Sequence, residues 1–222
     1  MTKTCSELFQ GMDCTIIGNG NEEVAGLAFR SDEVAPGDMF FCIVGTVVDG
    51  HSFAQDAIDR GATSLVAERK VYLADATDVT EVVVSDSRKA MAYASANYYD
   101  NPSRAFSLVG ITGTNGKTTT TYLVEHIASV AGNRCGVIGT VGNKIAGAME
   151  HTERTTPESP DLQKLFARMR DAGCTVVAME VSSHALDLRR TWDTDFAVTA
   201  FTNLTQDHLD YHHTFDDYFE AK

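Results

Sequence analysis

The chain has 222 residues, of which 43% are hydrophobic and 22% are charged. This length and composition fit a globular protein with one large domain or two ordinary ones, and they exclude a disordered chain. The formal net charge of −13 argues against non-specific binding to nucleic acid. No apolar run approaches the ~20 residues that a membrane-spanning helix needs. We therefore expect neither a nucleic-acid partner nor a membrane span.

The cysteines indicate a reducing compartment. Their number, five, is odd, and none of them forms a C-x-x-C pair. Cys42, Cys135 and Cys174 lie within or beside apolar runs, so we expect buried thiols, as in cytosolic proteins. The amino terminus also lacks the basic and then apolar regions of a signal peptide. We therefore expect a cytoplasmic protein.

Short apolar runs alternate with helical patterns in the first half of the chain. They predict strands at 38–44, 63–67 and 81–85 and helices at 52–60 and 88–99. This alternation indicates a small α/β domain. The segment 101–103 (NPS) is the expected boundary, because turn residues cluster there just before the next strand. We therefore divide the chain into domains 1–104 and 105–222.

The second half has the pattern of a doubly wound parallel sheet. Strands are predicted at 107–111, 135–141, 174–179 and 196–201, and helices from 117, from about 155 to 172, and over 214–222. In the first of these helices, Leu123, Ile127 and Val130 are spaced to face a core. Gly173 should follow the second helix, and Thr214 should cap the third. Because that helix has only begun at the last residue, we expect a piece of a longer protein.

The most informative stretch is 107–121, SLVGITGTNGKTTTT. A strand, a Gly-rich turn and a helix start direct several backbone N–H groups to one point, which attracts phosphate. The strict P-loop pattern would need Gly at position 111, where this chain has Ile, but Gly113 and Gly116 still allow close approach of the backbone. Lys117 would contact the β- and γ-phosphates, and Thr118 a Mg²⁺ ion. The alternative is an ordinary turn with a solvated lysine.

Polar residues follow the third and fourth predicted strands. Glu180 ends one of them at the same sheet edge as the phosphate loop, where an acid can hold Mg²⁺ directly or through water; a solvated acid is the alternative. Ser182, Ser183 and His184 follow, and they could equally be a helix cap and a packed histidine. Residues 201–213 contain three histidines and two aspartates. Without paired cysteines or an H-E-x-x-H pattern, one histidine near a magnesium–nucleotide centre is favoured over a zinc site.

These motifs together give the chain a resemblance to a known family. It resembles the Mur ligases, the ATP-dependent amino-acid-adding enzymes of peptidoglycan synthesis. The matching stretches are 110–120 (GITGTNGKTTT), 155–157 (TTP), 180–186 (EVSSHAL), 201–212 (FTNLTQDHLDYH) and 218–222 (YFEAK), with 35–50 and 85–90 in the first domain. Within the family the chain is most similar to the members that add the third residue to UDP-MurNAc-L-Ala-D-Glu.

The resemblance implies a role for each matching residue. The implied ATP-binding residues are Gly113, Thr114, Asn115, Gly116, Lys117, Thr118, Thr119 and Asn203. The implied metal ligands are Thr118, Glu180, His208 and Lys222, where Lys222 carries a carbamate derived from CO₂. The implied catalytic residues are Lys117, His208 and Lys222. The implied substrate-binding residues are Phe29 and Ser31 at the uridine end, and Thr155, Thr156, Ser182 and Arg190 along the peptide; Thr155 and Thr156 could also serve as helix caps.

The implied reaction is an ATP-dependent ligation. The D-Glu carboxylate of UDP-MurNAc-L-Ala-D-Glu would accept the γ-phosphoryl group, and the resulting acyl phosphate would be attacked by the amine of diaminopimelate, lysine or another amino acid. The cofactors would be ATP and Mg²⁺, and the protein would be a monomer. One alternative is a folylpolyglutamate synthetase-like ligase. Another is a fragment that binds without turnover, because the terminal carboxylate beside Lys222 should keep its amine as an ammonium that cannot react with CO₂.

Overall fold

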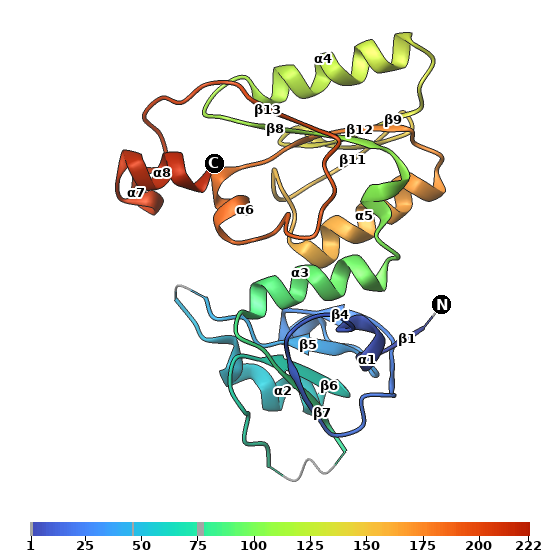
Figure 1. Ribbon diagram of the computed structural model, residues 1–222, viewed down its shortest axis with the longest axis vertical. Helices are drawn as coiled ribbons and strands as arrows, with labels where there is room; N and C mark the ends of the chain where they lie inside the picture. Colours follow the sequence, from blue (N-terminus) through green and yellow to red (C-terminus); the bar gives the residue numbers. More distant parts are fainter. Residues whose placement is uncertain (1, 46, 75–77) are drawn as a thin grey trace. The chain divides into compact units, whose positions relative to one another are not determined.

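A computed structural model describes residues 2–45, 47–74 and 78–222. The chain forms two compact units, Met1–Tyr98 and Tyr99–Lys222 (Figure 1). Within the described ranges, no helix is both long enough and apolar enough to cross a membrane.

The first unit is a small α/β domain. Its elements are β1 (Lys3–Thr4), α1 (Cys5–Leu8), β2 (Thr15–Ile17), β3 (Glu23–Val24), β4 (Leu27–Ala28), η1 (Ser31–Glu33), β5 (Met39–Phe41), η2 (Gly50–Phe53), α2 (Ala54–Asp59), β6 (Ser64–Ala67), β7 (Thr80–Val83) and α3 (Ser87–Tyr98). The main sheet has the order β2-β7-β6-β5-β4, in which β4 to β7 run parallel and β2 is antiparallel to β7. β1 and β3 form a separate antiparallel pair.

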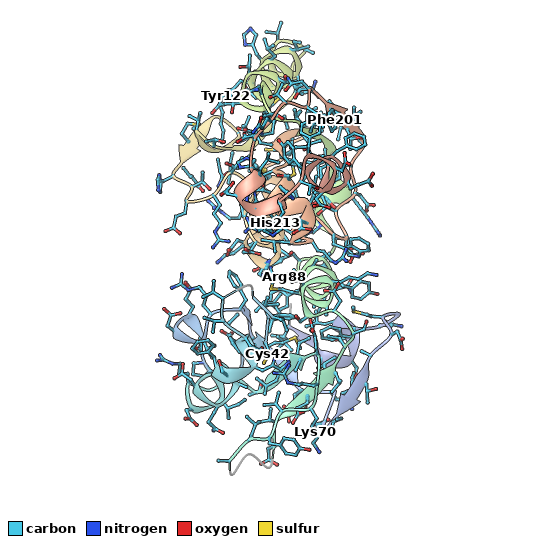
Figure 2. All side chains as sticks on the ribbon, turned by 90° about the vertical axis from the view of Figure 1, so that its left-hand side faces the viewer. Cys42, Lys70, Arg88, Tyr122, Phe201 and His213 are labelled. Atoms are coloured by element: carbon cyan, nitrogen blue, oxygen red, sulfur yellow. The ribbon has the colours of Figure 1, made fainter. Side chains whose placement is uncertain are left out.

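Strand β5 shows why this unit has two apolar layers. Met39 and Phe41 pack in one core with Met91 of α3, whereas Phe40 packs in the other with Ala57 of α2. Neighbouring strand residues point to opposite faces, so a fully apolar strand needs a cover on both. Cys42 is also fully buried in this unit, and Lys70 lies at its periphery (Figure 2).

Two predicted elements of the first unit are shorter than expected. β5 ends at Phe41 instead of reaching residue 44, because the Ile43 N–H turns back to the Phe41 carbonyl at 3.0 Å. The predicted helix 52–60 is divided into η2 and α2. There the Asp49 carboxylate accepts the His51 N–H at 3.0 Å and begins a tight 3₁₀ turn before the α-helix.

The second unit is the doubly wound parallel sheet that the pattern predicted. Its elements are η3 (Pro102–Ala105), β8 (Ser107–Thr112), α4 (Lys117–Val130), β9 (Cys135–Gly139), β10 (Gly142–Ile145), β11 (Ala148–Glu150), α5 (Ser159–Asp171), β12 (Val176–Glu180), α6 (Ser183–Asp187), β13 (Val198–Phe201), α7 (Leu209–His212) and α8 (Phe215–Ala221). The sheet order is β11-β10-β9-β12-β8-β13, with β9, β12, β8 and β13 parallel. α4 covers one face of the sheet, and α5 and α6 cover the other (Figure 1).

The prediction that Leu123, Ile127 and Val130 of α4 face a core is wrong. These side chains are 55%, 67% and 76% exposed, whereas Thr121 and Glu125 of the same helix are buried. The phase of the helix is set at its start, where the Thr118 hydroxyl donates to the buried Glu180 carboxylate. Thr121 and Glu125 lie on the same face as Thr118, so they turn toward the sheet and the apolar stripe turns away.

The second predicted helix begins later than expected. α5 starts at Ser159, with Glu158 at the N-cap position, so neither Thr155 nor Thr156 is its cap. The Thr156 hydroxyl instead donates to the Glu180 carbonyl at 2.9 Å and accepts the Ser182 N–H at 3.1 Å. The other two predicted helix signals are confirmed: Gly173 follows α5 with φ +75°, and Thr214 caps α8 by accepting the Asp217 N–H at 3.0 Å.

The burial of α4 can be tested with a matched pair of alanine substitutions. Because Ile127 is largely exposed, Ile127→Ala should change the free energy of unfolding by less than about 0.5 kcal/mol. Leu162 of α5 is fully buried, so Leu162→Ala should cost about 2–5 kcal/mol. Urea denaturation of both variants measures the difference. A large loss for Ile127→Ala would mean that the outer face of α4 is covered in solution.

Candidate functional site

The carboxyl ends of the parallel strands meet at one edge of the second sheet. The phosphate loop follows β8, Thr140 follows β9, and Ser182 lies just beyond β12. Thr202 and Asn203 follow β13. Parallel strands point their carboxyl ends the same way, so four short connections bring their side chains together there.

The phosphate loop depends on its glycines. Gly113 and Gly116 adopt φ of +131° and +84°, values that other residues rarely take. A Cβ atom on Gly113 would also lie 2.0 Å from the Thr202 hydroxyl oxygen. Gly116 is the N-cap of α4 and has no side chain to occupy the first N–H groups of that 14-residue helix. The helix start therefore remains suited to an anion.

Asn203 holds the loop from the next strand end. Its carbonyl accepts the Thr114 N–H at 2.9 Å, and its side-chain oxygen accepts the Asn115 N–H at 3.0 Å. Its side-chain NH₂ donates to the Asn115 carbonyl at 3.0 Å. Both ends of the Asn203 amide are thus bonded to the loop, so this residue fixes the backbone conformation of the predicted ATP site.

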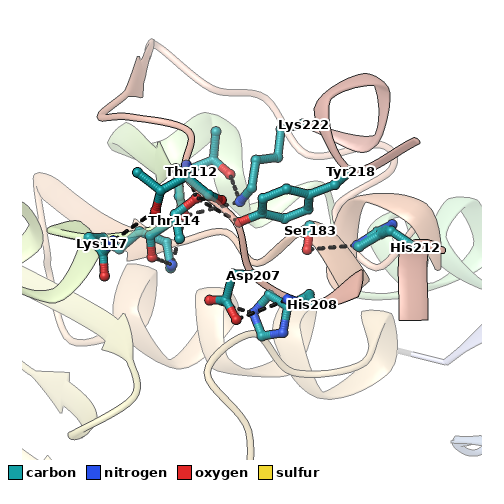
Figure 3. Close-up of polar contacts among 12 residues, drawn as sticks. Thr112, Thr114, Lys117, Ser183, Asp207, His208, His212, Tyr218 and Lys222 are labelled. Carbon is teal, nitrogen blue, oxygen red and sulfur yellow. Dashed lines mark hydrogen bonds and ion pairs between the residues drawn. The ribbon is translucent and has the colours of Figure 1, made fainter. Parts of the chain in front are cut away.

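Two lysine amines converge on the loop (Figure 3). Lys117 Nζ donates to the carbonyls of Gly113 at 2.8 Å and Thr114 at 2.9 Å, and Lys222 Nζ donates to the same Gly113 carbonyl at 3.0 Å. Burial lowers the pKa of Lys117. Burial, and secondly the Lys117 charge, lower the pKa of Lys222 to about 8. Burial beside a second cation therefore makes the neutral amine of Lys222 easier to form than in a free lysine, although the ammonium is still the major form at pH 7.

Glu180 is the best-supported candidate for a magnesium ligand. Its carboxylate is 1% exposed, and Oε2 accepts the Thr118 hydroxyl at 2.9 Å while Oε1 accepts the Thr140 N–H at 2.9 Å. Within the described part of the chain, no three His, Cys, Asp or Glu side chains are grouped to hold a metal ion. Mg²⁺ commonly uses one or two protein carboxylates together with water and substrate phosphates. One carboxylate beside one hydroxyl fits that ion.

His208 lies in a cluster of rings beside the loop. Its ring meets His184 edge-on at 4.8 Å between centroids and lies 6.1 Å from the ring of Tyr218. His212 Nε2 lies 2.9 Å from the Ser183 hydroxyl (Figure 3). Burial is the main cause that lowers the pKa of both His184 and His212, which favours their neutral forms. The ring of His208 thus lies beside rings whose charged forms are disfavoured by burial.

One cavity of about 410 Å³ brings seven of the predicted site residues together. The predicted residues that line it are Lys117, Thr155, Thr156, Ser182, Arg190, His208 and Lys222. Four further lining residues had not been assigned to the site: Thr140, Arg154, Ser183 and His184. Phe29 and Ser31 lie in the first unit, where Phe29 packs against the core and the Ser31 hydroxyl bonds to the Asp56 carboxylate.

Arg190 is held in place by contacts with Glu158 and Thr156. Its NH2 group lies 2.9 Å from Glu158 Oε1, and its NH1 group donates to the Thr156 carbonyl at 3.0 Å. Arg154 NH1 contacts the same Glu158 oxygen at 2.5 Å. A guanidinium that is fixed in this way has a set direction in the cavity, and a planar guanidinium suits the geometry of a carboxylate.

Tyr218 is a supporting residue that motif reasoning did not find. Its ring is fully buried, its hydroxyl lies 3.0 Å from Thr114 Oγ1, and Lys222 Nζ lies 4.9 Å from the ring centroid. Helical spacing alone could have placed Tyr218 one turn after Thr214 and one turn before Lys222. The contact with Thr114 spans 104 residues, and no local signal indicates it.

Removal of the Tyr218 hydroxyl should weaken this support. Tyr218→Phe deletes the bond to Thr114 but keeps the ring, so the free energy of unfolding should fall by about 0.5–1.5 kcal/mol. Chemical denaturation measures the change. Tyr72→Phe is the control, because Tyr72 is 91% exposed and its hydroxyl should contribute little. Equal stability of the two variants would contradict a role for the Thr114 contact.

A second prediction concerns the two amines. Lys117→Met removes the positive charge that lowers the pKa of Lys222, so that pKa should rise from about 8. Burial remains, and the rise should therefore be partial. NMR titration of ¹³C-labelled lysine side chains measures it, with Lys164→Met on the exposed face of α5 as the control. An unchanged or lower pKa for Lys222 would show that the two amines do not interact.

Known proteins resemble this chain over both of its units. The model of the Mur ligase family, catalytic domain, matches residues 23–111, and that of the Mur ligase middle domain matches residues 111–222. A UDP-N-acetylmuramoyl-L-alanyl-D-glutamate--2,6-diaminopimelate ligase of Geobacillus thermodenitrificans (strain NG80-2) is 49% identical over 203 residues, which cover 91% of this chain and 41% of the relative. The protein of the same name from Halalkalibacterium halodurans is 46% identical over 222 residues, which cover 100% of this chain and 45% of the relative.

Solved structures agree with these matches. A structure of a UDP-N-acetylmuramoyl-L-alanyl-D-glutamate--2,6-diaminopimelate ligase superposes with a TM-score of 0.81 at 28% identity and covers all of this chain and 44% of that one. The MurF ligase from Thermotoga maritima in complex with ADP gives a TM-score of 0.56 at 22% identity over 88% of this chain and 41% of that one, which shows the fold alone. The chain spans less than half the length of the relatives that it matches. Its two units nevertheless match successive parts of one family, and the chain belongs to the Mur ligases.

Proposed function

We propose that this chain forms the UDP-MurNAc-peptide-binding and ATP-binding parts of a ligase that adds the third amino acid to UDP-MurNAc-L-Ala-D-Glu. The cavity of about 410 Å³ carries this proposal, because it places Lys117 of the phosphate loop and Arg190 on the wall of one space. Lys117 would bind the γ-phosphate and Arg190 the carboxylate of the peptide, and phosphoryl transfer requires these two anions to meet. The names of the similar ligases favour 2,6-diaminopimelate as the incoming amino acid.

The nucleotide would bind at the start of α4. The N–H groups of its first turn and the Lys117 ammonium would contact the β- and γ-phosphates. Asn203 and Thr205 bond to loop residues, so the loop would be shaped before the nucleotide arrives. Because a preformed loop does not have to be ordered on binding, less entropy is lost and the affinity is higher.

Magnesium would be held by the Glu180 carboxylate and the Thr118 hydroxyl, which lie 2.9 Å apart. His208 and Lys222 would serve a second ion, provided that the Lys222 amine has become a carbamate, since an ammonium cannot bind a cation. The lowered pKa of Lys222, about 8, supplies the neutral amine that such a reaction needs. These ions would neutralise the charge that develops on the transferring phosphoryl group.

The chain's own residues would orient the acceptor. Arg190, with Thr155 and Ser182 beside it in the cavity, would hold the peptide so that its D-Glu side-chain carboxylate faces the γ-phosphate. Attack of a carboxylate oxygen on that phosphorus would break the bond to ADP and form an acyl phosphate. The incoming amine would attack its carbonyl carbon, and inorganic phosphate would leave. Lys117 would stabilise negative charge on the phosphoryl oxygens throughout.

The first domain, 1–104, would bind the uridine end through Phe29 and Ser31, and the second, 105–222, would bind ATP. The match of residues 23–111 to a Mur ligase model supports this assignment over a folylpolyglutamate synthetase-like ligase. A chain that binds both substrates without turnover is the second candidate.

Titration calorimetry with Mg-ATP tests the proposal. Lys117→Ala should weaken Mg-ATP binding about tenfold to a hundredfold, since each charge-assisted bond that is lost is worth about 1.5–3 kcal/mol. Lys164→Ala is the matched control on the exposed face of α5.

Arg190→Ala should weaken binding of UDP-MurNAc-L-Ala-D-Glu but leave UDP binding unchanged. Phosphate release with both substrates and diaminopimelate distinguishes a ligase from a binding fragment, and failure to bind either substrate would refute both.

A further inference from the structure

Thr140 occupies a position between the two halves of the site. It follows β9 directly and lines the cavity of about 410 Å³. Its N–H donates to Glu180 Oε1 at 2.9 Å, and its hydroxyl lies 2.9 Å from the hydroxyl of Thr155. One residue therefore contacts both the proposed magnesium carboxylate and the loop that faces the peptide.

The contact with Glu180 depends on close packing of two strand ends. β9 and β12 run side by side, with Ile138 paired to Met179, so Glu180 lies beside Gly139. A Cβ atom on Gly139 would stand 2.3 Å from Glu180 Oε1. The carboxylate therefore fills the space that a side chain at 139 would take, and the next N–H along the chain, that of Thr140, is its donor.

The two oxygens of Glu180 have different surroundings. Oε1 accepts a backbone N–H, which is fixed by the end of β9. Oε2 accepts the hydroxyls of Thr118 at 2.9 Å and Thr140 at 3.3 Å, and both of these can rotate. Oε1 is thus the anchored oxygen, whereas Oε2 can exchange the Thr118 hydroxyl proton for a cation while it keeps the Thr140 hydroxyl.

The direction in which the Thr140 hydroxyl donates its proton determines whether Thr155 is the donor or the acceptor in their contact. Thr140 has one hydroxyl proton and donates it to Glu180 Oε2. In the contact between the two threonines, Thr155 is then the donor, at 2.9 Å. The Thr155 oxygen keeps its lone pairs for the cavity, and it suits an N–H group of the peptide better than a carboxylate.

We propose that Thr140 is a positioning residue that fixes the Glu180 carboxylate for a divalent cation and couples it to Thr155 on the acceptor side of the cavity. The proposal rests on the proposed function, because it assumes that magnesium and nucleotide meet at Glu180. Groups that orient a ligating carboxylate commonly change metal affinity by about 10- to 100-fold when they are removed.

The experiment measures how Mg²⁺ strengthens ATP binding to the full chain. Thr140→Val removes the hydroxyl but keeps the shape and the N–H group, and Thr140→Ser keeps the hydroxyl. Thr140→Val should raise the Mg²⁺ concentration for half-maximal tightening about tenfold and leave ATP affinity without Mg²⁺ unchanged. Thr140→Ser should behave like the original chain. Thr175→Val is the control, because the Thr175 hydroxyl bonds to Asn133 before β12 begins.

The link to Thr155 gives a second readout. Thr140→Val and Thr155→Val should each weaken binding of UDP-MurNAc-L-Ala-D-Glu, and the double variant should lose less than the sum, because both changes break one contact. Thr140→Ala replaces Thr140→Val if the latter does not fold.

Each outcome separates the inference from the proposed function. If the original chain shows no Mg²⁺-dependent ATP binding, both are overturned. If it does and Thr140→Val has the same Mg²⁺ dependence, the inference alone is overturned. Equal loss of ATP affinity with and without Mg²⁺ would also overturn it, because that pattern reports general damage to the loop.

Discussion

The buried carboxylate of Glu180 is the constraint on which the second unit depends. A carboxylate that is 1% exposed is costly unless its oxygens accept hydrogen bonds. Here the donors come from two other strand connections, Thr118 after β8 and Thr140 after β9. The same requirement that stabilises the charge therefore sets the phase of α4 and the end of β9, and it leaves one oxygen beside a hydroxyl that suits magnesium.

The cationic side chains of the site are concentrated in one place, although the chain as a whole has a net charge of −13. Lys117 and Lys222 donate to one carbonyl oxygen, that of Gly113, and Arg154 and Arg190 share one oxygen of Glu158. The arginine pair shares one carboxylate within the protein, whereas the lysine pair shares only a neutral carbonyl. An anion at the phosphate loop would relieve the repulsion between the two amines, which gives this end of the cavity a preference for phosphate that the acidic surface lacks.

Much of the polar chemistry in this site is internal support. Asn203 uses both ends of its amide on Asn115, and Thr156 bonds to the backbone of Glu180 and Ser182. Tyr218 contacts Thr114 with its hydroxyl. Residues that a motif would assign to ligand binding thus include several that hold other residues in place. Such support reduces the entropy that is lost when the site becomes ordered around a ligand.

The sequence by itself determined the strand, turn and helix of the phosphate loop, the parallel sheet with polar groups at its carboxyl edge, and the resemblance to the Mur ligases. These features are local: glycine conformations, apolar runs and the residues that follow a strand can be read within about 15 positions. The face of α4, the late start of α5 and the roles of Thr140 and Tyr218 were decided by the tertiary structure. Each depends on a contact between distant residues, from the 24 positions between Thr156 and Glu180 to the 104 between Thr114 and Tyr218. The pKa of Lys222 belongs with them, because burial and a neighbouring amine exist only once α8 lies against the loop.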